Sequence, residues 1–325
     1  MKRILSIVLL CALLLGLCAC ANQSETETTA APNAVNQDDP AGDDTMNVLF
    51  ISNSTSWYFV DELYGMLAAA GHDNYNLCHA YYSGCSLQQH VEFWKNGETP
   101  YRFKVTNKNG VNITENVGLE TALAFQNWDV IITHNNAYSA RSCEVDTTYA
   151  ETKPYLTELM DYVRSKYPLS RYLWLNKWTP DVGYTVSFQM TSIDQRDKIQ
   201  QTDKQVSALV KKDYGMDTIP CGDAWSKVRD MELFATVPQG VETEKYSLFT
   251  QIFNGKISDD SVHDGDIGGG QYLNACVLFE VLTGESCLDN TFRPKYVFNG
   301  LDLSLSEEKI EILKNAAHEA VAAQK

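Results

Sequence analysis

The sequence predicts an α/β fold, with a doubly wound, five-stranded parallel sheet sandwiched between helices and a β-hairpin insertion. Two observations lead to this prediction. Short apolar runs alternate with segments of helical periodicity from residue 46 onward, and the runs have the β-branched and aromatic content of buried strands. The alternation continues without a second linker, so we expect one domain over residues 46–325.

The expected strands are short and apolar, as strands covered on both faces are. They cover residues 47–52, 75–81, 128–133, 172–175 and 216–220. Apolar side chains recur at helical spacing in residues 57–70, 154–166 and 272–282. Pro154 fits the first turn of the second of these helices. Residues 101–105 and 110–114 flank Asn109-Gly110, a dipeptide typical of tight hairpin turns, and therefore predict the insertion.

Residues 1–19 are predicted to be a lipoprotein signal peptide. Two basic residues precede a mostly apolar run over residues 4–17, which is shorter than the roughly 20 residues that a spanning helix needs. Ala19 directly before Cys20 is typical of a bacterial lipobox, whereas Cys18 is a weaker candidate. We expect a lipid anchor on Cys20 at the extracytoplasmic face of the cell membrane, and secretion without a lipid is the alternative.

Residues 20–45 are predicted to be a disordered, acidic tether between the membrane and the domain. After Cys20 the segment carries six acidic residues and no basic one, and it lacks the apolar residues of a core. The formal charge of the whole chain is −16, and loss of Lys2 and Arg3 with the signal peptide makes it −18. A nucleic acid is therefore not expected among the partners.

Six cysteines follow the tether, without the CxxC spacing or the grouping of a zinc site. They are Cys78, Cys85, Cys143, Cys221, Cys276 and Cys287. We expect free buried thiols, and disulfides between Cys78 and Cys85 or between Cys276 and Cys287, which export would permit, are the alternative. No metal or cofactor is expected.

Polar residues follow the first three strands, at the sheet edge where ligands of open α/β folds bind. Ser54 follows the first strand at the start of a helix, whose dipole favours developing negative charge, although serine is also common as a helix cap. Gly84 follows the second strand, and its N–H can donate to an oxyanion. Asn135 follows the third strand between His134 and Asn136; these side chains are donor candidates, or polar residues of an ordinary turn.

Asp260 and His263 form a DxxH pair after the fifth strand. A neutral histidine can accept the proton of a serine when a carboxylate holds its other ring nitrogen. The pair therefore predicts a catalytic triad with Ser54. A metal site that includes His263, Asp264 and Asp266 is the alternative, although the segment lacks the alternating acids of an EF-hand loop.

The order of these motifs resembles the blocks of SGNH (GDSL-like) hydrolases. More narrowly, the chain is similar to a branch of that superfamily whose nucleophile block is of the Gly-Asn-Ser-Phe type, and here residues 51–55 are Ile-Ser-Asn-Ser-Thr. Further matching stretches are residues 84–90, 128–132, 219–225 and 263–273. The resemblance covers roughly residues 46–285 and implies a flavodoxin-like arrangement of the sheet.

The resemblance implies ester hydrolysis by acyl transfer to Ser54, with His263 as general base and Asp260 as the residue that orients it. The backbone N–H groups of Ser54 and Gly84 and the side chain of Asn135 would form the oxyanion hole. The implied substrates are acyl esters, including acetyl esters, of small molecules or polysaccharides.

Two departures from the pattern leave a second function open. Ser52 replaces the usual glycine before the nucleophile block, and Thr55 replaces a bulky apolar residue. A glycan-binding surface lipoprotein without turnover is therefore the alternative function, and a structural envelope lipoprotein is a third. His90, His134 and Trp178 are candidate substrate-binding residues near the strand ends, with packing inside the domain as the alternative.

The anchor can be tested by cell fractionation. Changing Cys20 to Ala removes the predicted lipid acceptor, so this variant should move from the membrane fraction to the soluble fraction. The matched variant Cys18→Ala should stay in the membrane fraction, because the predicted acceptor remains. Immunoblots of both fractions measure the distribution, and membrane association of Cys20→Ala would contradict the assignment.

Overall fold

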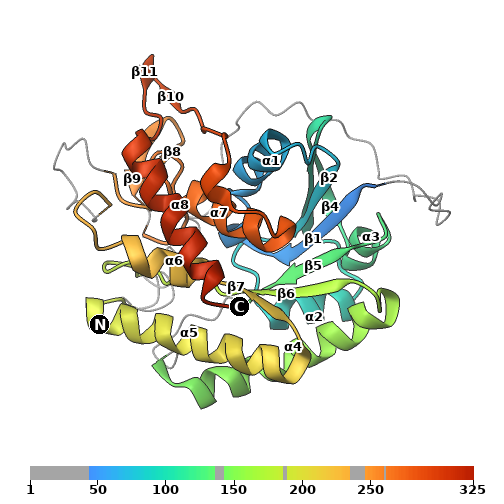
Figure 1. Ribbon diagram of the computed structural model, residues 1–325. Coiled ribbons are helices and arrows are strands. Elements are labelled where there is room, and N and C mark those ends of the chain that lie inside the picture. Colours follow the sequence, from blue (N-terminus) through green and yellow to red (C-terminus); the bar gives the residue numbers. More distant parts are fainter. Residues whose placement is uncertain (1–43, 136–142, 186–188, 235–245, 260) are drawn as a thin grey trace, which may run out of the picture.

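The computed structural model describes residues 44–135, 143–185, 189–234, 246–259 and 261–325. In these residues the main sheet has the strand order β4-β3-β2-β1-β5-β6-β7 (Figure 1). The strands are β1 Met46–Ser52, β2 Tyr75–Tyr81, β3 Tyr101–Asn107, β4 Gly110–Val117, β5 Val130–Thr133, β6 Arg171–Leu175 and β7 Asp217–Ile219. The five strands β2, β1, β5, β6 and β7, in this spatial order, pair in parallel. At the β2 edge, β3 pairs antiparallel with β2, and β4 pairs antiparallel with β3.

Helices cover both faces of this sheet (Figure 1). They are α1 Val60–Ala69, α2 Leu87–Lys95, α3 Leu119–Leu123, α4 Val145–Lys166, α5 Ile193–Tyr214, α6 Cys221–Val228, α7 Gly270–Thr283 and α8 Glu307–Ala322. One face packs against α1, α6, α7 and α8, and the other against α2, α3, α4 and α5. Two small hairpins complete the described fold, β8 Thr250–Phe253 with β9 Lys256–Asp259, and β10 Val297–Phe298 with β11 Leu301–Asp302.

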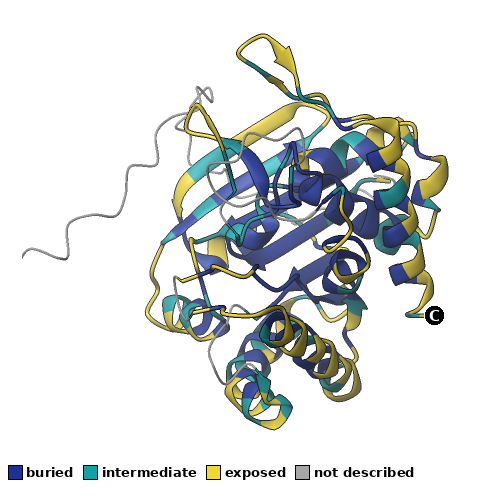
Figure 2. Cartoon of the chain, turned by 90° about the vertical axis from the view of Figure 1, so that its left-hand side faces the viewer, coloured by how far each residue is buried: buried dark blue, intermediate teal, exposed yellow. Residues whose placement is uncertain are grey.

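The central strand β1 shows why its sequence is apolar without alternation. Val48 and Phe50 lie in the core on one face, Leu49 and Ile51 lie in the core on the other, and all four are fully buried. Figure 2 shows the middle strands as the most buried part of the chain. A strand covered on both faces needs apolar side chains at successive positions.

The predicted α/β fold with a mostly parallel sheet and flanking helices is confirmed. The strand count differs from the predicted five, because β3 and β4 extend the same sheet. The helix expected over residues 154–166 begins at Val145, so Pro154 lies inside it rather than in its first turn. Its earlier turns bury Thr148 and Thr152 instead of apolar side chains, which hid them from the periodicity.

The N-terminal segment and the cysteines were the subject of two further predictions. Residues 1–43, which include the proposed signal peptide, Cys20 and most of the tether, lie outside the described residues. Within the described part, none of the helices combines the length and apolar character needed to cross a membrane. The six cysteines after the tether are free thiols.

The strand order places a switch point beside β1. The chain passes from β1 to β2 on one side and later returns to β5 on the other side of β1. Crossover connections on opposite faces diverge at such a point, which leaves a crevice beyond the carboxyl ends of the two strands. Residues that directly follow β1 and β5 are therefore placed where open α/β folds bind ligands.

Glu62 of α1 is a buried carboxyl group next to the C-terminal part of the chain. The Tyr296 hydroxyl donates to Oε1 of Glu62 at 2.7 Å, whereas Oε2 has no hydrogen-bond partner among the described residues. Burial raises the pKa of Glu62 from 4.5 to about 7; the Tyr296 hydrogen bond opposes this rise, and the charge of Asp61 adds to it. The folded protein therefore favours the protonated carboxyl group.

The free energy of unfolding should fall as the pH rises from about 4.5 to about 7, because the folded state keeps the Glu62 proton to higher pH than the unfolded chain. Glu62→Gln retains an oxygen acceptor for Tyr296 and removes the titration. The variant should gain stability relative to the parent between pH 5 and pH 8, by up to roughly 3 kcal/mol. Urea unfolding at both pH values measures the difference, and parallel profiles would contradict the assignment.

Candidate active site

Ser54 lies directly beyond the carboxyl end of β1, at the switch point. It begins the 3-10 turn η1 (Ser54–Ser56) and is half-buried. Asn53 caps this turn, since its Oδ1 accepts from the Thr55 N–H at 3.0 Å and from the Thr55 hydroxyl at 2.8 Å. Neither the hydroxyl nor the backbone N–H of Ser54 donates to another described residue. Ser54 therefore does not serve as the helix cap that its position suggested.

The other hydroxyls around Ser54 belong to a buried hydrogen-bond network, the serine–histidine network of Ser52, Ser56, His79 and His134. The Ser56 hydroxyl donates to Ser52 Oγ at 2.5 Å, and Ser52 Oγ lies 2.5 Å from Nε2 of His134. Nε2 of His79 lies 3.2 Å from Ser56 Oγ. These four side chains are buried and connect β2, β1 and the residue after β5.

Both histidines of this network are neutral. Nδ1 of His134 donates to the carbonyl of Asn135 at 3.0 Å, so Nε2 carries the lone pair and accepts from Ser52. Burial lowers the pKa of His134 to about 3, with a further contribution from the charge of Lys177. Burial also lowers the pKa of His79 well below its usual range. His134 therefore acts as an acceptor inside the protein, and its Nε2 is not a donor for an oxyanion.

Gly84 occupies the exposed turn after β2. Its φ of 64° is in the left-handed region, which favours glycine. The Asn53 amide donates to the carbonyl of the next residue, Cys85, at 2.9 Å, and therefore ties this turn to the turn that carries Ser54. Ser86 then begins α2 with a capping box that includes Gln89. Two strand ends that approach the candidate site are thus held together by one asparagine.

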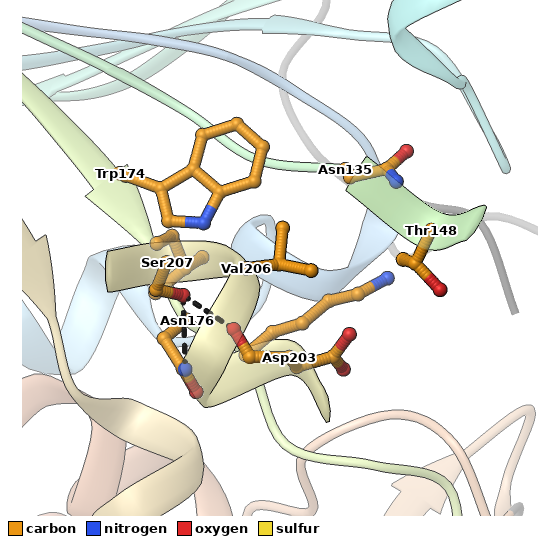
Figure 3. A pocket seen from close by; sticks show the side chains of 9 residues that line it. Asn135, Thr148, Trp174, Asn176, Asp203, Val206 and Ser207 are labelled. Atoms are coloured by element: carbon orange, nitrogen blue, oxygen red, sulfur yellow. Dashed lines mark hydrogen bonds between the residues drawn. The ribbon is translucent and has the colours of Figure 1, made fainter. Parts of the chain in front are cut away.

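Asn135 follows β5, but its side chain is turned toward α4. Its amide donates to the hydroxyl of Thr152 at 2.8 Å. Asn135 and Thr148 lie on one side of a small cavity, opposite Asp203 (Figure 3). The volume of this cavity is about 20 Å³, which is room for about one water molecule. At least one amide proton of Asn135 therefore serves the packing of α4 rather than the space next to Ser54.

The same cavity is lined by Lys177, a residue outside the sequence motifs. Lys177 is buried, and burial lowers the pKa of its ammonium group, whereas burial raises the pKa of the Asp203 carboxyl group. Lys177 comes two residues after Leu175, the last residue of β6. The rule that polar residues after strand ends mark the site would have found Lys177 if it had been applied to this strand.

His263 lies in the loop between β9 and α7, and it is half-buried. Its ring packs edge-on against Tyr58, with 5.3 Å between ring centroids and an interplanar angle of 71°. Tyr58 follows Ser54 by four residues, so this contact places the His263 loop against the segment that carries Ser54. Tyr58 was not selected from the sequence. Asp260, the predicted partner of His263, lies outside the described residues, as does Asn136.

The three residues suggested for substrate binding have other roles in this structure. His90 is 1 % exposed, and its Nδ1 is hydrogen-bonded to the Tyr101 hydroxyl at 2.8 Å. His134 belongs to the serine–histidine network. Trp178 is 1 % exposed and stacks on Trp225. All three side chains are therefore packed inside the domain, and a role in substrate binding stays a prediction.

The carboxylates that were considered as metal ligands stabilise their own loop. Asp264 accepts from the Asn274 amide at 3.0 Å, and Asp266 accepts from the backbone N–H groups of Ile252 and Ile267 at 3.0 and 2.6 Å. Within the described ranges, no three His, Cys, Asp or Glu side chains come together as a metal site. The absence of a metal stays a prediction.

The fold and the position of Ser54 define a doubly wound α/β protein with a candidate site at the switch point of its sheet. A family model described as "Domain of unknown function (DUF4886)" matches residues 47–320. The chain therefore belongs to the DUF4886 family. A comparison with curated proteins found no match.

Several solved structures are similar to the chain. A DUF4886 family protein from Bacteroides uniformis is 24% identical with a TM-score of 0.64, over 87% of this chain and 97% of that chain, and therefore shares the fold. A GDSL-like lipase from Bacteroides thetaiotaomicron is 11% identical with a TM-score of 0.39, over 73% and 86%. A variant of an acetyl-xylooligosaccharide esterase from Geobacillus is 12% identical with a TM-score of 0.43, over 74% and 95%.

Two serine variants separate structural hydroxyls from the candidate nucleophile. Ser52→Ala removes the hydroxyl that lies 2.5 Å from both Ser56 Oγ and Nε2 of His134 and leaves them with longer contacts, at 3.2 Å to His79 and to Thr55 respectively, so it should lower the free energy of unfolding by roughly 1 to 3 kcal/mol. Ser54→Ala removes a hydroxyl without such a partner and should change it by less than about 0.5 kcal/mol. Denaturant unfolding compares the two variants. Equal losses would show that Ser54 also has a structural role.

Proposed function

We propose that this protein is a serine hydrolase of the SGNH type that cleaves ester bonds, with Ser54 as nucleophile, His263 as general base and Asp260 as the residue that orients it. The observation that carries the proposal is the state of Ser54. Its hydroxyl lies at the switch point without a hydrogen bond to a described residue, while the hydroxyls of Ser52, Thr55 and Ser56 are all engaged. The order of the sequence motifs supports the same roles.

In the proposed reaction, Ser54 Oγ attacks the carbonyl carbon of the ester while its proton passes to His263. The oxyanion accepts hydrogen bonds from the N–H groups of Ser54 and Gly84, with Asn135 as a third donor. The carbon–oxygen bond to the alcohol then breaks, and the alcohol leaves with the proton from His263. Water then attacks the acyl-enzyme carbonyl and gives a proton to His263. The bond between the acyl carbon and Ser54 Oγ breaks, His263 returns the proton to Ser54 Oγ, and the acid leaves.

The proposed substrates are acyl esters of carbohydrates, and acetylated polysaccharides are the first to test. This choice is an analogy with the superfamily. The proposal includes a lipid anchor at Cys20, which would hold the domain at the extracytoplasmic face of the membrane. An acidic tether of some 25 residues would give the domain freedom to reach a polymer near the membrane.

A fluorophosphonate probe tests the nucleophile without knowledge of the substrate. The parent should be labelled, Ser54→Ala should not be labelled, and Asp260→Asn and His263→Ala should react on the order of a thousandfold more slowly or worse. Labelling is followed by gel fluorescence and the modified peptide by mass spectrometry. A chelator should leave the rate unchanged, whereas a metal-dependent hydrolase would lose activity. Full labelling of His263→Ala would refute the triad.

A glycan-binding protein without turnover is the second candidate function. The observation in its favour concerns Asn135. Its side-chain amide donates a hydrogen bond to Thr152 of α4, and that proton is therefore not available to an oxyanion. The same experiment separates the two candidates. An unlabelled parent that retains acetylated polysaccharide in a pull-down would support the binding function.

A further inference from the structure

The loop that carries His263 is held on its N-terminal side by the segment that follows β6. The indole N–H of Trp178 donates to the carbonyl of Val262 at 2.8 Å, and the backbone N–H of Asp181 donates to the carbonyl of Ser261 at 2.8 Å. Ser261 has a φ of 63°, a left-handed conformation that costs energy for a serine and persists only where surrounding contacts enforce it. These two hydrogen bonds supply such contacts directly before His263.

The loop is held on its C-terminal side through a different set of residues. Oδ2 of Asp264 accepts from the amide of Asn274 at 3.0 Å, and Asn274 is fully buried in α7. Oδ1 of the same Asn274 accepts from the indole N–H of Trp225 at 2.9 Å. Asp264, the residue directly after His263, is therefore connected through one asparagine to a second tryptophan.

The two tryptophans form one rigid unit. Their rings stack with 4.8 Å between centroids and an interplanar angle of 10°, and neither ring is exposed by more than 1 %. Gly270 at the start of α7 is required for this arrangement, because a Cβ there would lie 2.8 Å from the Trp225 ring. The stack therefore couples the residues before and after His263 to the end of β6, to α6 and to α7.

The segment around Trp178 is itself fixed. Gln200 of α5 accepts from both the N–H and the hydroxyl of Thr179 at 2.9 Å, and Arg229 donates to the Thr179 carbonyl at 3.0 Å. Each of these three side chains is buried. Because the segment around Trp178 is fixed in this way, the hydrogen bond from Trp178 holds Val262 in place.

We propose that Trp178 and Trp225 are positioning residues for His263, acting through Val262 and through Asn274 and Asp264. The proposal rests on the proposed function, because it assigns a purpose to holding His263 only if that histidine acts on Ser54. A base held from both sides keeps its ring in a fixed position relative to the nucleophile. A displacement of about 1 Å in such a group lowers reaction rates on the order of a hundredfold.

The test uses variants that keep an aromatic ring at each position and remove the indole N–H together with part of the ring, so a control with the same loss of volume is needed. Trp178→Phe removes the bond to Val262, and Trp225→Phe removes the bond to Asn274. Trp128→Phe is the matched control, since Trp128 is 4 % exposed and its indole N–H donates to the carbonyl of Leu123 at 2.8 Å. It precedes β5 and therefore lies at the opposite end of the sheet from the candidate site.

For each full-length variant, kcat and KM on an activated acetyl ester are measured with the rate of fluorophosphonate labelling and the denaturant midpoint. We expect the three midpoints to shift by similar amounts. We expect kcat and the labelling rate of Trp178→Phe to fall by about 10- to 100-fold with KM changed by less than about threefold. The kcat and labelling rate of Trp225→Phe should also fall, and those of Trp128→Phe should stay within about twofold of the parent.

The outcomes separate this proposal from the proposed function. The positioning role alone would be overturned by two results together. The parent would be active and Ser54→Ala unlabelled, and Trp178→Phe and Trp225→Phe would have the same rates as Trp128→Phe. A parent without labelling or ester hydrolysis would overturn both. If Trp178→Phe does not fold, Trp225→Phe tests the second connection, and a kcat unchanged in that variant overturns the paired role.

Discussion

The interaction on which the candidate site depends is the buried hydrogen bond between Ser52 and His134. Ser52 is the last residue of β1, and His134 directly follows β5, so this bond joins the two strands between which the order of the sheet reverses. Ser56 extends the connection to His79 of β2. Three neighbouring strand ends are therefore joined by one polar network. Each of its four side chains has a hydrogen-bond partner inside the core, while Nδ1 of His79 has none among the described residues.

The departure at Ser52 has a physical explanation in this network. A glycine at that position would leave His134 Nε2 and the Ser56 hydroxyl without the oxygen that joins them, whereas serine supplies both a donor and an acceptor. Thr55 fits in the same way, because its hydroxyl donates to the capping side chain of Asn53. In the hydroxyl-rich sequence from Ser52 to Ser56, the hydroxyls of Ser52, Thr55 and Ser56 are therefore hydrogen-bonded inside the domain. The Ser54 hydroxyl is the one without a hydrogen bond to a described residue.

The elements of the fold could be predicted from the sequence to the extent that burial determines composition. The strand over Tyr75–Tyr81 was predicted with its observed bounds, since a strand buried on both faces must be apolar. The first turns of α4 could not be predicted, because Thr148 and Thr152 take buried positions through hydrogen bonds that no periodicity reveals. The packing of Trp178 could not be predicted either, because its stacking partner Trp225 is 47 positions away in the sequence. Its position after a strand therefore suggested a ligand-binding residue.

The two sides of the candidate site are built in different ways. Ser54 and Gly84 follow strands of the central sheet, and Asn53 ties their turns together, so their positions follow from the sheet itself. His263 lies in a loop without regular structure, where Gly265 and Gly268 press closely against the backbone of Thr250 and Ser247. A Cβ at either glycine would clash with a carbonyl oxygen, so this loop has little room to shift toward the β8 segment. The geometry between nucleophile and base therefore depends on how firmly side chains from outside the loop hold it, because the sheet alone fixes only one of the two partners.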